Sequence, residues 1–167
     1  LDMRMGKSTE LTAAKVVNKY DEAELIRVLK NYGELTNARQ LASIIVARRN
    51  ERKFETTEDL VQAIEKVFPP QKRMQNLAKV FQGIRIEVND EMGSLEALLK
   101  QSVEVLKPNG NLVVISYHSL EDRPVKRFMR AGDLNGEVKK DFFGNPERPF
   151  TPQPGKPITP SKEEIEK

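Results

Sequence analysis

The stretch Lys107-Pro-Asn-Gly-Asn-Leu-Val-Val-Ile-Ser-Tyr117 decides the fold class that the sequence predicts. It opens with a turn composition, and residues 111–117 that follow are rich in β-branched side chains and apolar on both faces. Such a segment is typical of an interior strand of a parallel sheet, because helices cover both sides of that sheet. We therefore expect an α/β fold in which a helix at Leu95–Leu106 leads into this strand.

Upstream of this stretch, residues 12–88 have a helical pattern. Apolar residues recur at three- and four-residue steps, for example Leu77, Val80, Phe81, Ile84 and Val88. Single helices of such length are unstable in water, so we expect the first four helices to pack as a compact bundle.

Polar residues at the predicted helix starts indicate caps. Thr12 is expected to cap a helix from Ala13, and Asn37 a later one. Thr56 followed three residues later by Asp59 resembles a capping box. A cluster of acidic residues at 87–91 is interpreted as a solvent-facing helix end and not as acid–base machinery.

Composition excludes several classes of protein. The 28 Lys and Arg residues nearly balance the 25 Asp and Glu residues, so attraction to nucleic acid must come from local clusters. The absence of cysteine excludes disulfides and thiolate chemistry and suits a cytoplasmic protein. One histidine without cysteine argues against a transition-metal site. Apolar runs such as Leu112–Ile115 are too short to span a membrane, so no membrane partner is predicted.

A candidate site follows the predicted strand. Ligands in open α/β sheets bind at the carboxyl ends of strands, where Tyr117, His118 and Ser119 are expected to emerge. His118 has an equally good alternative, that it only satisfies a strand end by hydrogen bonding. The hydroxyl of Ser119, or the carboxylate of Asp122, is expected to cap the next helix. Pro124 favours a start of that helix near Asp122, since proline is comfortable only in a first turn.

Basic residues form three clusters, one on the helix after Tyr117 and two at the ends of upstream helices. Such side chains make salt-sensitive contacts to phosphates, although a solvated surface is the alternative for each cluster. The predicted RNA-binding residues are Arg48, Arg49, Arg52, Lys53, Lys72, Arg73, Arg123, Lys126, Arg127 and Arg130.

The end of the chain has a loop composition. Residues 131–155 are rich in Gly, Pro and Asn, which predicts a long loop anchored at Asp141–Phe143. Ile158 is predicted to lie in a short edge strand, and Ser161 to cap a last helix.

Several motifs together resemble one family. Phe81-Gln-Gly-Ile-Arg-Ile-Glu-Val-Asn-Asp-Glu-Met92 precedes Val114-Ile-Ser-Tyr-His-Ser-Leu-Glu-Asp-Arg123, and the chain opens with Leu1-Asp-Met-Arg-Met5. Lys156-Pro-Ile-Thr-Pro-Ser161 follows in the same order. These segments are similar to the MraW family of 16S rRNA cytosine-N4 methyltransferases, over nearly the whole chain.

The resemblance implies a class I, Rossmann-like methyltransferase core interrupted by an all-α helical insert. It divides the chain into a core segment at 1–8, the insert at 9–88, and the C-terminal part of the core at 89–167. The implied reaction transfers a methyl group from S-adenosyl-L-methionine to a cytidine N4 near the decoding site of 16S rRNA in the small ribosomal subunit.

The resemblance also implies where the site residues lie. The family's cofactor-binding residues precede the Leu-Asp-Met-Arg-Met motif, so we expect none in this chain, an upstream start of the natural protein, and no activity of this part alone. Asp2 and Arg4 become candidate pocket residues, approached by Tyr117, His118 and Ser119 from the strand end. The catalytic residues stay unknown.

Three positions depart from the family pattern, and the first is Gly6, which stands where an acidic residue is usual. Asn109 stands in a turn that commonly reads Pro-Gly-Gly, and should preserve it because asparagine tolerates positive φ. Pro124 replaces a β-branched residue and is expected to shift the start of the basic helix.

Other functions stay open at this point. The chain could be a non-catalytic RNA-binding or protein-interaction module, and steep weakening of binding by salt would favour RNA. A methyltransferase acting on another substrate is the third alternative, because fold does not fix function. The oligomeric state, with a homodimer as one alternative, is not decided by the sequence.

Overall fold

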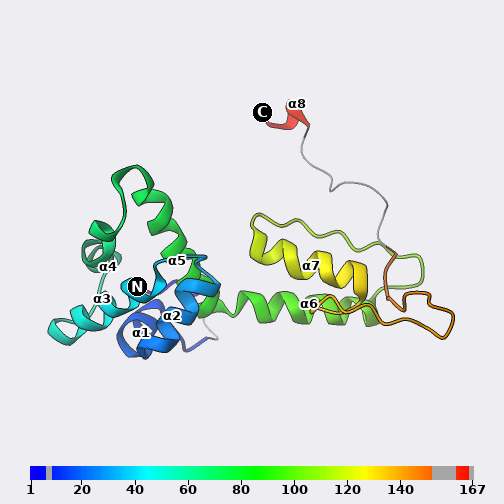
Figure 1. The fold of residues 1–167 in the computed structure, drawn as a ribbon, viewed down its shortest axis with the longest axis horizontal. Coiled ribbons are helices and arrows are strands. Elements are labelled where there is room, and N and C mark those ends of the chain that lie inside the picture. The colour runs from blue at the N-terminus through cyan, green and yellow to red at the C-terminus, as the bar shows by residue number, and fades with distance from the viewer. Residues whose placement is uncertain (7–8, 152–160, 166–167) are drawn as a thin grey trace. The chain divides into compact units, whose positions relative to one another are not determined.

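The computed structural model describes residues 1–6, 9–151 and 161–165, and Figure 1 labels its helices. The chain divides into two compact units, Leu1–Leu95 and Glu96–Lys167. The α-helices are α1 (Ala13–Lys19), α2 (Glu22–Asn31), α3 (Ala38–Glu51), α4 (Thr57–Ile64), α5 (Arg73–Asn89), α6 (Glu91–Val105), α7 (Ser119–Ala131) and α8 (Lys162–Ile165). Two 3-10 turns, η1 (Glu65–Val67) and η2 (Pro70–Lys72), join α4 to α5.

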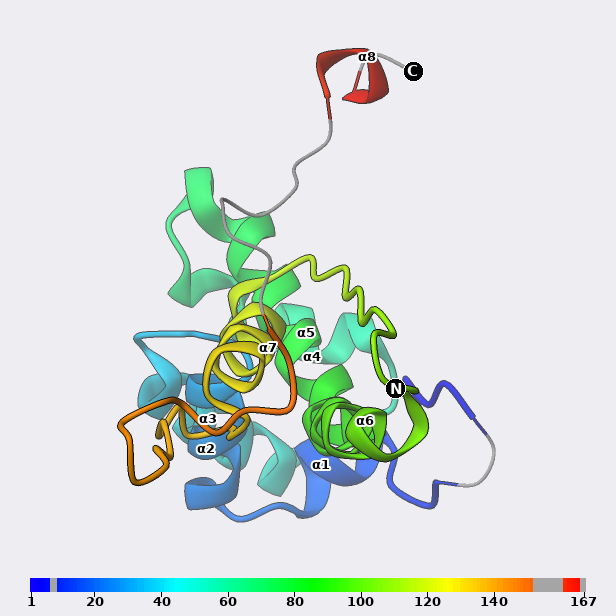
Figure 2. The same ribbon diagram turned by 90° about the vertical axis from the view of Figure 1, so that its right-hand side faces the viewer.

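The first unit is a helical bundle, as the apolar spacing predicts. Helix α2 packs on α3 and α5, α3 also packs on α4, and α1 contacts α3 and α5. The adjacency of α2 and α3 can be followed in both views (Figure 1, Figure 2). The centre is fully buried and comes from all five helices: Val16, Val17, Leu25, Leu29, Leu41, Ile45, Leu60, Ile64, Val80 and Ile84.

Two glycines allow α2 and α5 to approach closely. The amide of Gly33 donates to the carbonyl of Val28 just after α2 ends at Asn31. A Cβ placed on Gly83 of α5 would lie 2.8 Å from the backbone nitrogen of Gly33. A side chain at Gly83 would collide with backbone atoms of Gly33, so only glycine fits where α5 approaches the end of α2.

Within the first unit, local capping is predicted correctly in two of three places. Thr12 accepts a hydrogen bond from Lys15 N, and Thr56 with Asp59 forms a complete capping box. The prediction for Asn37 is wrong, since its side chain makes no cap bond. Its ψ of 27° lies outside the extended region from which a cap side chain reaches the helix.

The predicted strand at 111–117 is wrong for the part of the chain that the structure describes. No β-strand occurs in residues 1–6, 9–151 or 161–165, and the single β-bridge joins Lys140 to Pro146. Val113, Ile115 and Tyr117 are 82%, 77% and 91% exposed. A strand needs a neighbour for its backbone groups, and no described segment provides one here. The described fold is mostly helical, so an α/β sheet is not confirmed.

The second unit is built around α7, which starts earlier than predicted. The amides of Glu121 and Asp122 both donate to the carbonyl of His118, so the helix begins at Ser119 and contains Pro124. The predicted start near Asp122 is therefore wrong. Upstream, Asn109 has a φ of 66° and Gly110 N donates to Lys107 O at 2.9 Å, which confirms the predicted turn.

The predicted cap of the last helix is confirmed, because Glu164 N donates to Oγ of Ser161 at 3.3 Å. The predicted edge strand at Ile158 lies outside the described residues.

Candidate functional site

The opening segment Leu1–Met5 is folded against the bundle. The backbone amides at the start of α1 donate to it, Ala13 N to Asp2 O and Ala14 N to Leu1 O, both at 2.9 Å. The side chains of Leu1 and Met3 pack on the bundle core, and Met3 has a φ of 63°. A methionine in the left-handed region is held there only by surrounding contacts, so this segment has a defined conformation.

Asp2 and Arg4 form a two-point ion pair within this segment. Arg4 Nε lies 2.6 Å from Asp2 Oδ1, and Nη2 lies 3.0 Å from Oδ2. The guanidinium also donates to the carbonyl of Thr9 at 3.2 Å. The hydrogen bond from Arg4 lowers the pKa of Asp2 below its ordinary value. Asp2 is thus an exposed, firmly ionised carboxylate that can accept a hydrogen bond from an amine.

Asn89 at the end of α5 holds the same segment, and sequence reasoning did not single it out. Its Oδ1 accepts from Met5 N at 2.7 Å, and its Nδ2 donates to Met3 O at 2.9 Å and to Arg85 O at 2.8 Å. The only signal in the sequence is an amide residue at the end of an amphipathic helix. One side chain thus fixes the backbone on both sides of Arg4.

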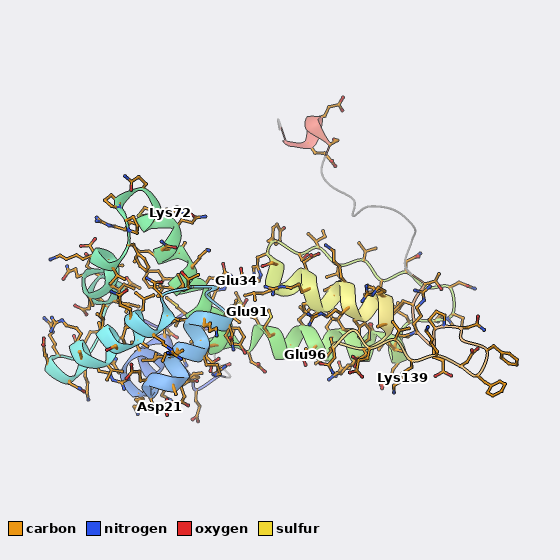
Figure 3. The ribbon with its side chains drawn as sticks, in the orientation of Figure 1. Asp21, Glu34, Lys72, Glu91, Glu96 and Lys139 are labelled. Atoms are coloured by element: carbon orange, nitrogen blue, oxygen red, sulfur yellow. The ribbon has the colours of Figure 1, made fainter. Side chains whose placement is uncertain are left out.

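Of the acidic residues at 87–91, Asp90 is exposed as predicted, whereas Glu87 and Glu91 do not face solvent. Glu87 is 12% exposed and accepts from Tyr20 Oη at 2.8 Å and from Arg27 Nη2 at 2.5 Å. Burial and the hydrogen bond to Glu87 raise the pKa of Tyr20 to about 12. Glu91, labelled in Figure 3, binds Arg85 through two contacts of 2.8 and 3.1 Å. These pairs join helices and leave no acid–base pair exposed among them.

The residues after the predicted strand gather at the start of α7. Tyr117 N donates to Glu121 Oε2 at 3.2 Å, and His118 Nε2 lies 3.1 Å from Glu121 Oε1. Neither ring nitrogen of His118 makes a well-directed hydrogen bond to a described residue. The contact with Glu121 is an ion pair only when the imidazole ring is protonated. Ser119 is the first residue of α7, and Arg123 Nε donates to its carbonyl.

Asp2 and Arg4 belong to the first compact unit, and Tyr117, His118 and Ser119 to the second. That the two groups share a pocket therefore stays a prediction.

The basic stripe on α7 faces outward. Arg123, Lys126, Arg127 and Arg130 are all exposed, while Phe128 between them is buried. Lys126 Nζ pairs with Asp122 Oδ2 at 2.6 Å, one turn earlier. The helix therefore presents cations on one face and packs the other, as the spacing predicts.

In the two upstream basic clusters, some side chains contact other residues of the bundle and others are exposed. Arg49 Nη1 donates to the carbonyls of Val17 and Tyr20 at 3.1 and 2.6 Å, so it holds the end of α1. Arg48 pairs with Glu51 at 3.0 Å, and Arg73 lies 3.9 Å from Glu65. Arg52, Lys53 and Lys72 are exposed, the last labelled in Figure 3.

Within the described ranges, no group of three or more His, Asp or Glu residues could hold a metal ion. No helix there is long and apolar enough to cross a membrane.

Comparison with known proteins points to a single family. A family model described as the MraW methylase family matches residues 1–167. Proteins named ribosomal RNA small subunit methyltransferase H are similar. The Amoebophilus asiaticus protein is 50% identical over 165 residues, which is 99% of this chain and 53% of that protein. The Bacteroides fragilis (strain YCH46) protein is 48% identical over 165 residues, 99% of this chain and 54% of its own.

The Flavobacterium psychrophilum protein of the same name is 53% identical over 150 residues, which is 90% of this chain and 52% of that protein. The chain thus spans about half the length of the curated relatives it matches.

Proposed function

The chain belongs to the MraW methylase family, and from this premise we propose that it serves S-adenosylmethionine-dependent methylation of a cytidine N4 in 16S rRNA near the decoding site. Its part in that reaction is to recognise the RNA and to position the target base. The observation that carries the proposal is 50% identity over 165 residues to a protein named for small-subunit rRNA methylation. The family model matches both the Leu1–Met5 segment and the start of α7.

The described residues do not fit the methyl donor. Class I methyltransferases belong to the doubly wound folds, which bind nucleotide-like cofactors at a glycine-rich turn between a strand and a helix. The described ranges contain no β-strand and hence no such turn. We therefore derive no step through the donor from this chain.

Methyl transfer to an amine is an in-line displacement, so its rate depends chiefly on how the amine is oriented. The target cytosine must be unpaired before its N4 can be reached. A carboxylate that accepts one N4–H fixes the direction of the nitrogen lone pair. We assign this role to Asp2, because Arg4 orients its carboxylate through two hydrogen bonds and Asn89 holds the backbone of the neighbouring Met3.

The exposed stretch at 111–117 supports the α/β part of the proposal. Its exposure alternates along the chain, with Val113, Ile115 and Tyr117 outward and the residues between them half-buried. A period of two is the geometry of a strand. The relatives contain about as much chain again as the matched region, enough to supply neighbouring strands.

The test is methylation of small ribosomal subunits that lack the modification, by the full-length gene product that carries this chain, with isotopically labelled S-adenosylmethionine. Mass spectrometry of nuclease-digested rRNA should find the label in N4-methylcytidine. Label in another nucleoside would overturn the proposed specificity. No label in rRNA at all would favour the interaction-module alternative, and large subunits serve as the control substrate.

A further inference from the structure

The second unit carries a short hairpin, residues 139–147, that displays two aromatic rings. We call it the Phe142–Phe143 hairpin. Phe142 is 98% exposed and Phe143 is 85% exposed. Their ring centroids lie 5.6 Å apart with an interplanar angle of 87°, so each ring keeps a face open to solvent. Exposing two adjacent phenylalanine rings to water is unfavourable, and exposed apolar surface of this kind commonly marks a binding site.

The hairpin holds these rings on an ordered turn. Lys139 and Glu147 are joined by a backbone hydrogen bond of 2.8 Å, and a β-bridge joins Lys140 to Pro146. The carboxylate of Asp141 accepts from the backbone amides of Phe143 and Asn145 at 2.9 and 2.8 Å.

The Asn145 side chain also donates to Asp141, at 3.0 Å, and lowers the pKa of that carboxyl. Gly144 completes the turn with a φ of 86°. The Asp141–Phe143 segment thus stabilises the tip of the loop through hydrogen bonds within the turn, and its two phenylalanine rings do not pack into a hydrophobic core.

The base of the hairpin is fixed to α7. Phe150 packs against Phe128 with centroids 6.2 Å apart, and Arg148 Nη1 donates to Arg130 O at 3.5 Å. The rings are therefore presented from the same compact unit as the exposed basic face of α7.

Charge around the rings favours a polyanion. Lys139, labelled in Figure 3, and Lys140 are exposed, and neither has an ion-pair partner in the part of the chain that the structure describes. Of the acids on this stretch, Asp141 is turned inward to serve the backbone, whereas Glu137 and Glu147 are exposed. The attraction to an anion is therefore local to the two lysines beside the rings. Exposed aromatic faces beside unpaired cations match the way proteins hold single-stranded nucleic acid.

We propose that the Phe142–Phe143 hairpin stacks on unpaired bases of the RNA substrate, while Lys139 and Lys140 contact the adjacent phosphates. This inference rests on the RNA substrate proposed above. The contact is sequence-tolerant, because every base offers an aromatic face. It orders a single-stranded stretch of the RNA substrate.

A single tryptophan reports the stacking directly, since the chain contains none. Phe142→Trp is titrated with a pyrimidine-rich single-stranded RNA of about 12 nucleotides, within the usual site sizes. Its fluorescence should be quenched by this RNA and not by a duplex of the same sequence. Val105→Trp, at an exposed apolar position on α6, a helix that carries none of the predicted RNA-binding residues, is the control. Equal quenching at both positions, or none at Phe142→Trp, overturns the contact.

Affinity is measured by anisotropy of the labelled RNA with the double variant Phe142→Leu/Phe143→Leu. Loss of stacking should weaken binding about tenfold or more, whereas Val105→Leu should not. Arg127→Gln/Arg130→Gln separates the two proposals. If it weakens binding and the leucine variant does not, the hairpin contact falls and RNA recognition stands.

If the wild-type chain binds no RNA, both proposals fall. Loss of self-association in the leucine variant, with RNA affinity unchanged, would assign the rings to a second copy of the chain and overturn the RNA contact.

Discussion

The backbone amide of Met5 donates a 2.7 Å hydrogen bond to Oδ1 of Asn89, 84 positions later in the chain. The other end of the same amide side chain donates to Met3 O. The opening motif and the end of α5 therefore form one structural unit. Arg4 lies between the two tethered residues, so the orientation of the Asp2–Arg4 pair depends on Asn89.

Asn89→Ala should destabilise the first unit. The substitution leaves Met5 N and Met3 O without their partner and removes the contact to Arg85 O. We expect a loss of about 1–3 kcal/mol in the free energy of unfolding, measured by urea denaturation. Asn50→Ala, at an exposed position on α3, is the matched control and should change it little. Equal stability of the two variants would show that the tether contributes nothing.

Local features of the fold were predictable, because their causes lie within a few residues. The cap at Thr12 and the box of Thr56 and Asp59 each follow from polar side chains at fixed offsets. The apolar spacing of α5 likewise predicts its buried face. The cap predicted at Asn37 is wrong because capping also requires an extended backbone, which residue type does not guarantee.

Features that depend on distant residues were not predictable. A strand at 111–117 requires a neighbour, and the β-branched composition says nothing about whether one is present. The tether from Asn89 to Met5 has no periodicity, since it joins a helix end to an irregular segment. Asp2 and Arg4 entered the candidate site through the family motif, and their pairing became visible only in three dimensions.

Arg4→Gln should raise the pKa of Asp2 toward its ordinary value of 3.8. In the folded wild type this pKa is lowered, so the pair is favourable above the unfolded pKa and is lost as the pH falls through the folded one. A carboxyl-detected NMR titration of Asp2 should therefore show a lower midpoint in the wild type than in Arg4→Gln. Arg48→Gln, which breaks the pair with Glu51 instead, should leave Asp2 unchanged. An identical Asp2 midpoint in all three proteins would contradict the pairing.

Tyr20→Phe should remove a pH-dependent contribution to stability. The folded pKa of Tyr20 is raised from 10.0 to about 12, so its contribution is complete below pH 10 and is lost as the pH rises through 12. At neutral pH the variant loses the hydrogen bond to Glu87, which should cost about 1 kcal/mol in urea denaturation. Tyr117→Phe removes a hydroxyl from an exposed ring and should cost nothing. The prediction fails if the two variants have the same stability at neutral pH.

Gly83→Ala should destabilise the bundle by about 1–3 kcal/mol. The new methyl group would meet backbone atoms of Gly33 at 2.8 and 3.1 Å, and these cannot move without shifting α2. Gly93→Ala in α6 is the matched control, because its methyl group meets only the movable carboxylate of Asp90. That substitution should be neutral or stabilise the helix by up to about 1 kcal/mol. Thermal denaturation in which both variants shift in the same direction would refute the close-packing argument.

Asp2→Asn in the full-length gene product should reduce kcat/KM for methylation of small subunits about tenfold or more. The substitution keeps the size of the side chain and removes the charge that Arg4 holds in place, so the amine of the target base loses an ionised acceptor. Glu58→Gln, an exposed carboxylate on α4, is the control and should not alter the rate. Because the base must still bind, we expect the RNA affinity of Asp2→Asn to stay close to that of the wild type while kcat falls. Unchanged kcat in Asp2→Asn would remove Asp2 from the site and leave the pair with Arg4 as a purely structural contact.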